Sequence, residues 1–252
     1  MNRPRLIVHQ SASLDGRLTL APDVLLLWGD ARWTAISQGG SDAYAAVKAQ
    51  YRPGALLEGS GSFVLEGQDS EPLPPAGDTA VLYEDHLPEE IVRRDGHVGW
   101  MTVVDGRGRV RWLYKEYPDP AWAGWYLLVL VHRQTPPEYL AYLRRELIPY
   151  LVAGSGPHVD LGAGLVKLRE RLDVTTVVST AGGRLNGALL RAGLVDEVSV
   201  EFLPGLIGGF TTPSLFDSPS LGPEEAPTRL RLLAPPQAQG DTVWLRYAVV
   251  RE

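Results

Sequence analysis

The sequence contains no cysteine among its 252 residues. A disulfide framework, a thiolate-bound zinc or iron–sulfur centre and a cysteine nucleophile are therefore excluded, and this suits the reducing cytoplasm in which we expect the protein to act. Long apolar runs are also lacking, since the longest one near the middle, Trp125–Val131, is too short to span a bilayer. Residues 1–10 carry two arginines but no apolar core of the kind a signal peptide needs.

Several signatures of common functional sites are missing as well. The formal net charge of -6 argues against a general nucleic-acid binder, which needs a basic face. No Gly-x-Gly-x-x-Gly follows the first predicted strand and no Gly-Lys-Ser or Gly-Lys-Thr occurs, which disfavours a standard Rossmann dehydrogenase and a P-loop nucleotide triphosphatase. Gly59-Ser60-Gly61 lacks the spacing of a serine-hydrolase nucleophile elbow. The histidines show no metal-ligand pairing, so we predict no metal site.

What the sequence does contain is an alternation of strand-like and helix-like segments. The predicted strands are residues 6–8, 55–57, 79–83, 101–104, 125–132, 150–152, 174–178 and 198–203, with 109–113 as a hairpin partner and 228–233 and 242–250 as a closing antiparallel pair. This alternation predicts an α/β fold, with a mostly parallel sheet, helices on both faces and an antiparallel C-terminal edge. We expect a single domain over 1–252, with an irregular tryptophan-rich insertion at about 68–125.

Helix signals fall between these strands. The predicted helices are residues 41–50, capped by Ser41 or Asp42; a helix opened by a capping box at Thr135-Pro136-Pro137-Glu138, with Leu140, Leu143 and Leu147 inward and Pro149 as its stop; and residues 160–172, with Leu161, Leu165, Leu168 and Leu172 on one side.

The most informative stretch runs from Ser179 to Glu197. An apolar run at 174–178 precedes Gly182-Gly183, and a short helix follows with Leu185, Ala188, Leu189 and Ala192 at helical spacing. A strand that opens through paired glycines onto a helix N-terminus presents backbone N–H groups and the positive end of the helix dipole. These features favour a phosphate, so we place a nucleotide cofactor here.

Three other segments also follow predicted strands with small, polar or glycine residues, at 11–16, 58–62 and 105–108. Ligands of open α/β sheets collect beyond the carboxyl ends of the strands. Each segment alone is better explained as an ordinary turn, because loops favour glycine. Four such segments, with 180–187, favour a shared nucleotide site.

Four motifs along the chain carry a family resemblance. In order they are Ser13-Leu14-Asp15-Gly16-Arg17, Leu57-Glu58-Gly59-Ser60-Gly61-Ser62, the stretch from Gly182 to Glu197, and Leu203-Pro204-Gly205-Leu206-Ile207-Gly208-Gly209. The chain resembles the reductase domain of riboflavin biosynthesis, the dihydrofolate-reductase-like pyrimidine reductases of the deaminase-reductase family. The resemblance covers most of the chain and is weakest between residues 68 and 125. It implies a three-layer α/β/α fold, a homodimer and NADPH as cofactor.

The resemblance also implies a reaction and a set of site residues. In the family, 5-amino-6-(5-phosphoribosylamino)uracil is reduced to the ribitylamino product by hydride transfer to C1′ of the opened sugar. The cofactor-binding residues it implies are Ser11, Ser62, Gly106, Gly182, Gly183, Arg184, Leu185, Asn186, Gly187 and Ala188. The substrate-binding residues it implies are Asp15, Lys48 and Thr180, and no catalytic residue is assigned. The expected partner is a phosphorylated small molecule, with no nucleic acid and no membrane.

Plainer roles stay open for three of these residues. Lys48 is equally a solvated helix residue, Asp15 a turn residue before Gly16, and Arg184 a surface side chain. The cations that would favour NADPH over NADH by binding a 2′-phosphate are Arg107, Arg109, His132, Arg133 and Arg184.

The chain departs from the family at the start of its longest motif. Thr180-Ala181 stands where the family has Glu-Gly, so a neutral hydroxyl replaces a carboxylate at the substrate. A site built around a different polar group selects a different ligand. The zinc-binding Pro-Cys-x-x-Cys of the deaminase domain is absent too. Three hypotheses therefore stand: the riboflavin-pathway reductase, a reductase of the same fold acting on another heterocycle such as a pterin, and a non-enzymatic nucleotide-binding homologue.

Overall fold

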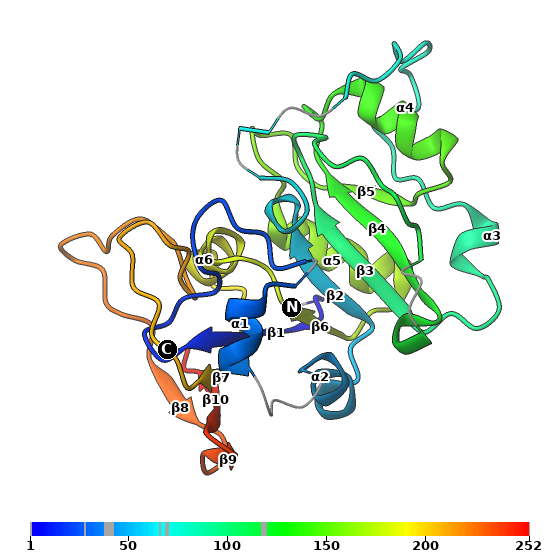
Figure 1. Ribbon diagram of the computed structural model, residues 1–252. Coiled ribbons are helices and arrows are strands. Elements are labelled where there is room, and N and C mark those ends of the chain that lie inside the picture. Colours follow the sequence, from blue (N-terminus) through cyan, green and yellow to red (C-terminus); the bar gives the residue numbers. More distant parts are fainter. Residues whose placement is uncertain are drawn as a thin grey trace. The chain divides into compact units, whose positions relative to one another are not determined.

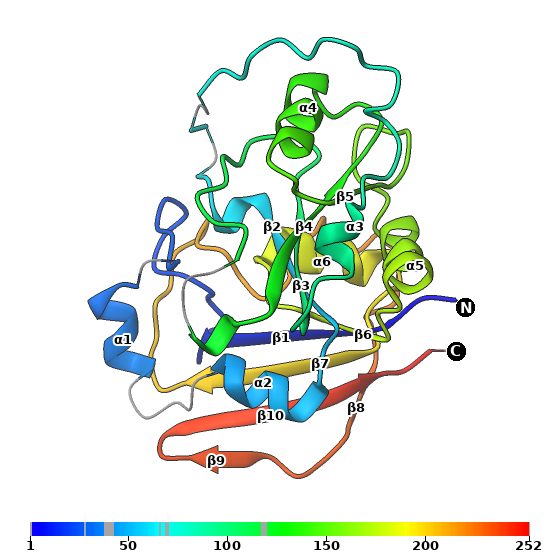
Figure 2. The same ribbon diagram turned by 90° about the vertical axis from the view of Figure 1, so that its right-hand side faces the viewer.

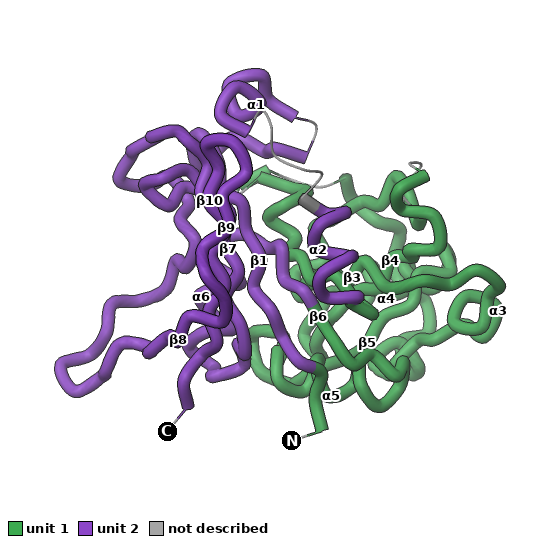
Figure 3. The backbone as a smooth tube through the Cα atoms, turned by 90° about the horizontal axis from the view of Figure 1, so that it is seen from below, with its two compact units in different colours: residues 1–4, 53–177 green, residues 5–52, 178–252 purple. Residues whose placement is uncertain are grey.

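The computed structural model describes residues 2–27, 29–37, 43–65, 67–68, 71–116 and 120–251 (Figure 1). The chain forms two compact units, which Figure 3 shows in different colours. Unit 1 comprises residues 1–4 and 53–177, and unit 2 comprises residues 5–52 and 178–252. The single domain expected from the sequence stays a prediction.

Unit 1 is built on four parallel strands. They are β2 (Ala55–Gly59), β3 (Gly99–Val104), β4 (Trp125–Val131) and β5 (Tyr150–Val152), hydrogen-bonded in that order (Figure 1). All seven residues of β4 are buried. Because side chains alternate between the faces of a strand, both faces of β4 are covered, as is usual for parallel sheets.

The helical segments of unit 1 follow these strands. They are η1 (Ser60–Ser62), α3 (Glu89–Val92), η2 (Pro120–Trp122), α4 (Pro137–Arg145) and α5 (Leu161–Leu172). The N-cap of α5 is Asp160, whose carboxylate accepts a hydrogen bond from the Ala163 N–H at 2.9 Å. A Cβ atom on Gly164 would lie 3.1 Å from Leu130 Cδ1, so the missing side chain lets α5 lie close to β4.

Unit 2 is a mixed sheet. β1 (Arg5–Ser13) pairs in parallel with β7 (Glu197–Leu203), β7 pairs antiparallel with β10 (Thr242–Val249), and β8 (Leu230–Leu232) and β9 (Gln237–Gln239) both pair antiparallel with β10 (Figure 2). Its helices are α1 (Ala31–Ser37), α2 (Ala43–Tyr51) and α6 (Gly183–Arg191), and β6 (Thr176–Ser179) carries the chain into it from unit 1. The predicted fold class, mostly parallel strands with antiparallel strands at the C-terminal end, is confirmed.

Two predicted strands are wrong. Residues 79–83 form turns, because the Asp78 carboxylate accepts from the Ala80 N–H at 2.9 Å and the Leu82 N–H donates to Thr79 O at 3.2 Å. Such local hydrogen bonds compete with extended backbone. Residues 109–113 form no hairpin, because β3 already has β2 on one edge and β4 on the other. The insertion expected at about 68–125 contains β3 and is regular there.

The predicted start and inner face of α4 also need correction. The N-cap is Pro136, with no side-chain capping bond. The Thr135 hydroxyl instead donates to Gly106 O at 2.9 Å and accepts from the His132 N–H at 3.1 Å. Leu147 lies beyond the helix end, has a positive φ of 54° and is 42% exposed, so it does not belong to the core.

Only one of the four apolar residues at helical spacing belongs to the buried face of α6. Its buried residues are Gly183, Asn186, Gly187 and Leu189, whereas Ala188 and Ala192 are exposed and Leu185 is half-buried. The helix therefore packs through small residues and one amide. For α2, both predicted N-caps lie outside the described residues.

A buried charge network joins four elements of unit 2. Glu197 of β7 is 1% exposed and accepts hydrogen bonds from the Tyr51 hydroxyl at 2.5 Å and from Arg246 Nε at 3.1 Å. Arg5 of β1 forms an ion pair with the same carboxylate. A buried carboxylate is tolerated only when it is paired in this way. Burial, with the Glu197 carboxylate beside it, raises the pKa of Tyr51 to about 12.

We expect Glu197→Ala to lower the free energy of unfolding by about 3 kcal/mol, because it leaves two arginines and a buried hydroxyl without their shared acceptor. Tyr51→Phe removes one hydrogen bond and should lower it by only about 1 kcal/mol. Urea unfolding of the two variants measures both values. Equal losses of unfolding free energy in the two variants would contradict the role of Glu197 as the shared acceptor of the network.

Candidate functional site

The turn from β6 into α6 is the predicted phosphate cradle. Gly182 is the N-cap, with φ −64° and ψ 165° and no side-chain capping bond, and its carbonyl accepts from the N–H groups of Leu185 and Asn186. The first turn of α6 holds no acidic residue. Gly182 and Arg184 are exposed. The helix therefore begins with the positive end of its dipole and two exposed residues, an arrangement that suits an anion.

The side chain of Asn186 fixes this turn from within. It is fully buried, accepts from the Ser179 hydroxyl at 2.8 Å, and donates through Nδ2 to Ala181 O at 2.7 Å. The Gln10 amide donates to the same carbonyl. Thr180, which is half-buried, lies within this hydrogen-bonded turn. The observed contacts of Asn186 are therefore those of a residue that shapes the cradle.

Gly183 and Gly187 pack against the loop at 214–218. A Cβ atom on Gly183 would lie closer than 3.0 Å to Ser214 O, and one on Gly187 equally close to Asp217 O. The Asp217 N–H also donates to Gly183 O at 3.0 Å. By contrast, a Cβ atom on Gly182 would meet nothing within 4 Å. Of these three glycines, only Gly182 has open space at the position of a side chain.

Gly183→Ala is expected to lower the free energy of unfolding by about 3 kcal/mol, because the added methyl group would overlap a backbone carbonyl. Gly182→Ala is the matched control and should change it by less than about 0.5 kcal/mol, since its backbone conformation is open to any residue. Urea unfolding compares the two. An equal loss of unfolding free energy in both variants would show that Gly183 is not packed more tightly than Gly182.

Asp15 holds the loop that follows β7. Its carboxylate accepts from the Ser13 hydroxyl at 2.6 Å, the Gly208 N–H at 2.7 Å and the Ile207 N–H at 3.1 Å. These hydrogen bonds, that of Ser13 first, lower the pKa of Asp15 from 3.8 to about 2. The carboxylate predicted to bind substrate is thus engaged by backbone of its own unit.

A lowered pKa makes the stabilisation by Asp15 depend on pH. The contribution is complete above pH 3.8, the ordinary pKa, and is lost as the pH falls toward about 2. We therefore expect wild type to be more stable than Asp15→Asn at pH 7, with the difference shrinking between about pH 4 and pH 2. Thermal unfolding across this range measures it. A difference independent of pH would show that the ionised carboxylate is not what holds the loop.

Ser11 lies beside a cavity of unit 2. Its hydroxyl donates to Glu201 Oε2 at 3.0 Å, and Glu201 lines a cavity of about 380 Å³ together with Thr242 and Trp244. Burial raises the pKa of Glu201, and the Ser11 hydrogen bond partly opposes this. A carboxyl group of this kind can either accept or donate a hydrogen bond inside the cavity. Lys48 lies half-buried in the last turn of α2.

Two predicted cofactor residues belong to unit 1. The Ser62 hydroxyl donates to Glu58 Oε2 at 2.7 Å at the end of β2. Gly106 follows β3 and packs on the ring of His132, since a Cβ atom there would lie 2.8 Å from its Nε2. Arg109 links the two places, because its guanidinium donates to the carbonyl oxygens of Val64 and Leu65. These contacts bring the segments after β2 and β3 together within the unit.

The remaining site predictions fall in unit 2, and the binding roles of all of them stay predictions. The residues of unit 2 are Ser11, Asp15, Lys48, Thr180, Gly182, Gly183, Arg184, Leu185, Asn186, Gly187 and Ala188. Across the described part of the chain, no three or more His, Asp or Glu side chains gather as a metal site would require. No helix in that part is long and apolar enough to cross a membrane.

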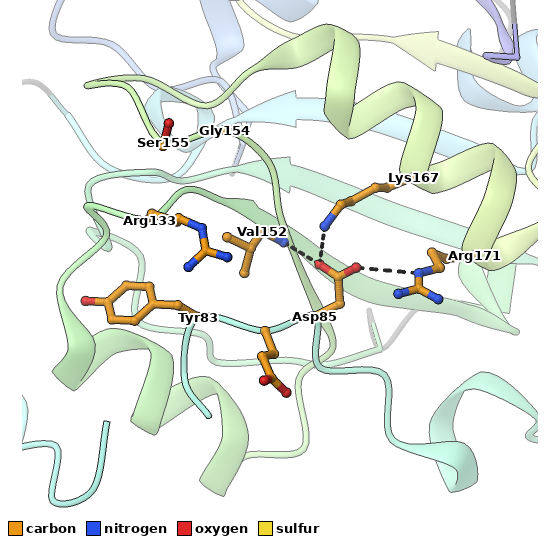
Figure 4. A pocket seen from close by; sticks show the side chains of 9 residues that line it. Tyr83, Asp85, Arg133, Val152, Gly154, Ser155, Lys167 and Arg171 are labelled. Atoms are coloured by element: carbon orange, nitrogen blue, oxygen red, sulfur yellow. Dashed lines mark hydrogen bonds and ion pairs between the residues drawn. The ribbon is translucent and has the colours of Figure 1, made fainter. Parts of the chain in front are cut away.

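Sequence reasoning missed a further cavity in unit 1, of about 570 Å³, which we call the β4–β5 pocket (Figure 4). Its lining residues are Tyr83, Glu84, Asp85, Arg133, Val152, Gly154, Ser155, Lys167 and Arg171. It lies where the chain leaves β4 and β5. The sequence could have indicated this pocket, because small residues follow β5 at Gly154-Ser155-Gly156. The four predicted segments rest on the same pattern of small residues after a strand.

Together these features define an α/β protein in which helix α6 begins at a glycine N-cap shortly after strand β6. The chain belongs to the family described as the RibD C-terminal domain, whose model matches residues 4–234. This match confirms the resemblance seen in the motifs.

Two curated relatives and one solved structure show the extent of the similarity. The chain is 30% identical over 131 residues to a 2,5-diamino-6-ribosylamino-4(3H)-pyrimidinone 5′-phosphate reductase of Methanothermobacter thermautotrophicus, covering 52% of this chain and 57% of the relative. It is 26% identical over 207 residues to the riboflavin biosynthesis protein RibD of Escherichia coli, covering 81% and 49%. The chain thus spans about half the length of these relatives. A pyrimidine reductase-like protein from Corynebacterium diphtheriae has the same fold, with a TM-score of 0.64, 18% identity, and 100% and 94% of the two chains covered.

Proposed function

We propose that this protein is an NADPH-dependent reductase of riboflavin biosynthesis. In the proposed reaction, 5-amino-6-(5-phosphoribosylamino)uracil is reduced to the 5-phosphoribitylamino product by hydride transfer to C1′ of the opened sugar. Membership of the RibD C-terminal domain family supports the reaction class. The observation that carries the proposal is the start of α6, where Gly182 and Arg184 are exposed at a helix N-terminus fixed by Asn186.

The residues present fit a nicotinamide dinucleotide at this place. The first turn of α6 carries no acidic residue of its own, which favours the cofactor phosphates, and Gly182 leaves room for them to approach the backbone on the side away from Asp217 and Gly183. The cofactor would supply the hydride, and the chain would supply orientation and electrostatics. Buried Asn186 and the close packing of Gly183 keep the turn rigid, so the donors do not need to be ordered on binding.

A second candidate substrate of the same reaction class follows from one residue and from the name of one relative. Thr180 stands where the family has Glu, so the chain carries a neutral hydroxyl in place of a carboxylate at this position. The relative from M. thermautotrophicus is named for the diaminopyrimidinone rather than for the aminouracil. We therefore propose 2,5-diamino-6-ribosylamino-4(3H)-pyrimidinone 5′-phosphate as the alternative substrate. The homodimer, the cytoplasmic location and the phosphorylated small-molecule partner are proposals that rest on the family.

The decisive experiment follows NADPH oxidation with each of the two pyrimidine phosphates, beside binding titrations with NADPH and NADH. We expect turnover with one of them and tighter binding of NADPH than of NADH. Binding without turnover of either compound would contradict the proposed reaction and favour another heterocycle. No binding of either cofactor would leave a non-enzymatic homologue.

A pair of variants tests the cradle itself. Gly182→Val should weaken NADPH binding about tenfold or more, because a branched side chain would fill the space where a phosphate approaches the backbone. Gly222→Val is the matched control, since Gly222 lies outside the predicted site and a Cβ atom there makes only ordinary contacts. Equal NADPH affinities of two folded variants would place the cofactor elsewhere.

A further inference from the structure

The β4–β5 pocket of unit 1 is walled by two loops that are tied together. The Arg133 N–H donates to Gly154 O at 3.1 Å, and the Gln134 amide donates to Ser155 O at 2.9 Å. Gly154 has a positive φ of 90°, and a Cβ atom there would lie 2.9 Å from the Asp160 Cβ. These hydrogen bonds to backbone carbonyls and the close approach at Gly154 hold the wall in shape, as in a preformed ligand pocket.

Asp85 gathers cations at one side of this pocket. Its Oδ1 accepts from the Val152 N–H at 2.9 Å and from Lys167 Nζ at 2.7 Å, and its Oδ2 lies 3.6 Å from Arg171 Nε. Lys167 and Arg171 both come from α5. Figure 4 shows these two side chains converging on Asp85. One carboxylate thus holds two cations in place and neutralises only one of their charges.

Arg133 enters the pocket from the opposite side, as Figure 4 shows. It is exposed, and among the described residues its guanidinium has no hydrogen-bond or ion-pair partner. Tyr83 also lines the pocket, and its hydroxyl donates to Thr135 O at 3.1 Å. Glu84 also lines the pocket, so three cations stand against two carboxylates, and the lining has a net positive charge.

We propose that the β4–β5 pocket binds the phosphate group of a small molecule, with Arg133 as its principal partner. An unpaired guanidinium presents a planar fork that matches phosphate oxygens, and Lys167 and Arg171 add positive charge from the facing wall. Ser155 is a further polar residue of the pocket wall. The volume of about 570 Å³ exceeds that of a phosphate alone and suits a phosphorylated metabolite. This inference stands without the proposed reductase activity.

The test uses inorganic phosphate as the probe and isothermal titration calorimetry on the full chain. Wild type should bind phosphate in the millimolar range, and Arg133→Gln should weaken the affinity about tenfold. Arg145→Gln is the matched control, because Arg145 is an exposed arginine in the last turn of α4 and does not line the pocket. Glu84→Gln removes a competing negative charge and should tighten binding about threefold, a gain that misfolding cannot produce.

Two results would overturn the proposal: equal phosphate affinity in the Arg133 and Arg145 variants, or no tightening in Glu84→Gln. Repeating the titration with saturating NADPH distinguishes the sources of the phosphate. Loss of the Arg133-dependent binding assigns the pocket to a phosphate of the cofactor, and its persistence assigns the pocket to a separate phosphorylated metabolite. Failure of the reductase proposal shows as absent NADPH oxidation, independently of the phosphate titration.

Discussion

The candidate cofactor site depends on one buried amide, that of Asn186. Its oxygen accepts from Ser179 at the end of β6, and its nitrogen donates to the Ala181 carbonyl. A buried amide left without hydrogen-bond partners is destabilising. The end of β6 and the start of α6 are therefore held in a fixed position relative to each other. In this arrangement Gly183 packs against the loop at 214–218, and Gly182 is exposed. The open side of the helix N-terminus is a consequence of this internal bonding.

The elements with strong local signals could be predicted from the sequence. The apolar run of β4 is a fully buried strand, and Asp160 caps α5 directly before its first residue. The wrong predictions arise where contacts with other parts of the chain determine the local structure. Residues 109–113 have strand-like composition, but β3 has no free edge to offer them. Residues 79–83 also have strand-like composition, but the Asp78 carboxylate accepts a hydrogen bond from the Ala80 N–H, which favours a turn.

The site shows the same division between local and distant information. The paired glycines, the helix and the family were readable from the motif around Gly182. Which glycine faces outward was not, because the loop at 214–218 that covers Gly183 lies some thirty residues further along the chain. The positive charge of the β4–β5 pocket could not be predicted from the sequence for a similar reason. Its cations come from two separate elements, and Asp85, which organises two of them, lies in a segment without regular structure.

The attachment of the loop after β7 has an evolutionary consequence. Asp15 binds the main-chain N–H groups of Ile207 and Gly208, so the path of this loop is specified without reference to its side chains. Leu206 is 77% exposed and Phe210 fully exposed, so neither is anchored by burial. Substitutions at these two positions are therefore nearly neutral for folding. Natural selection can therefore vary the side chains that this loop presents to solvent while the path of its backbone stays unchanged.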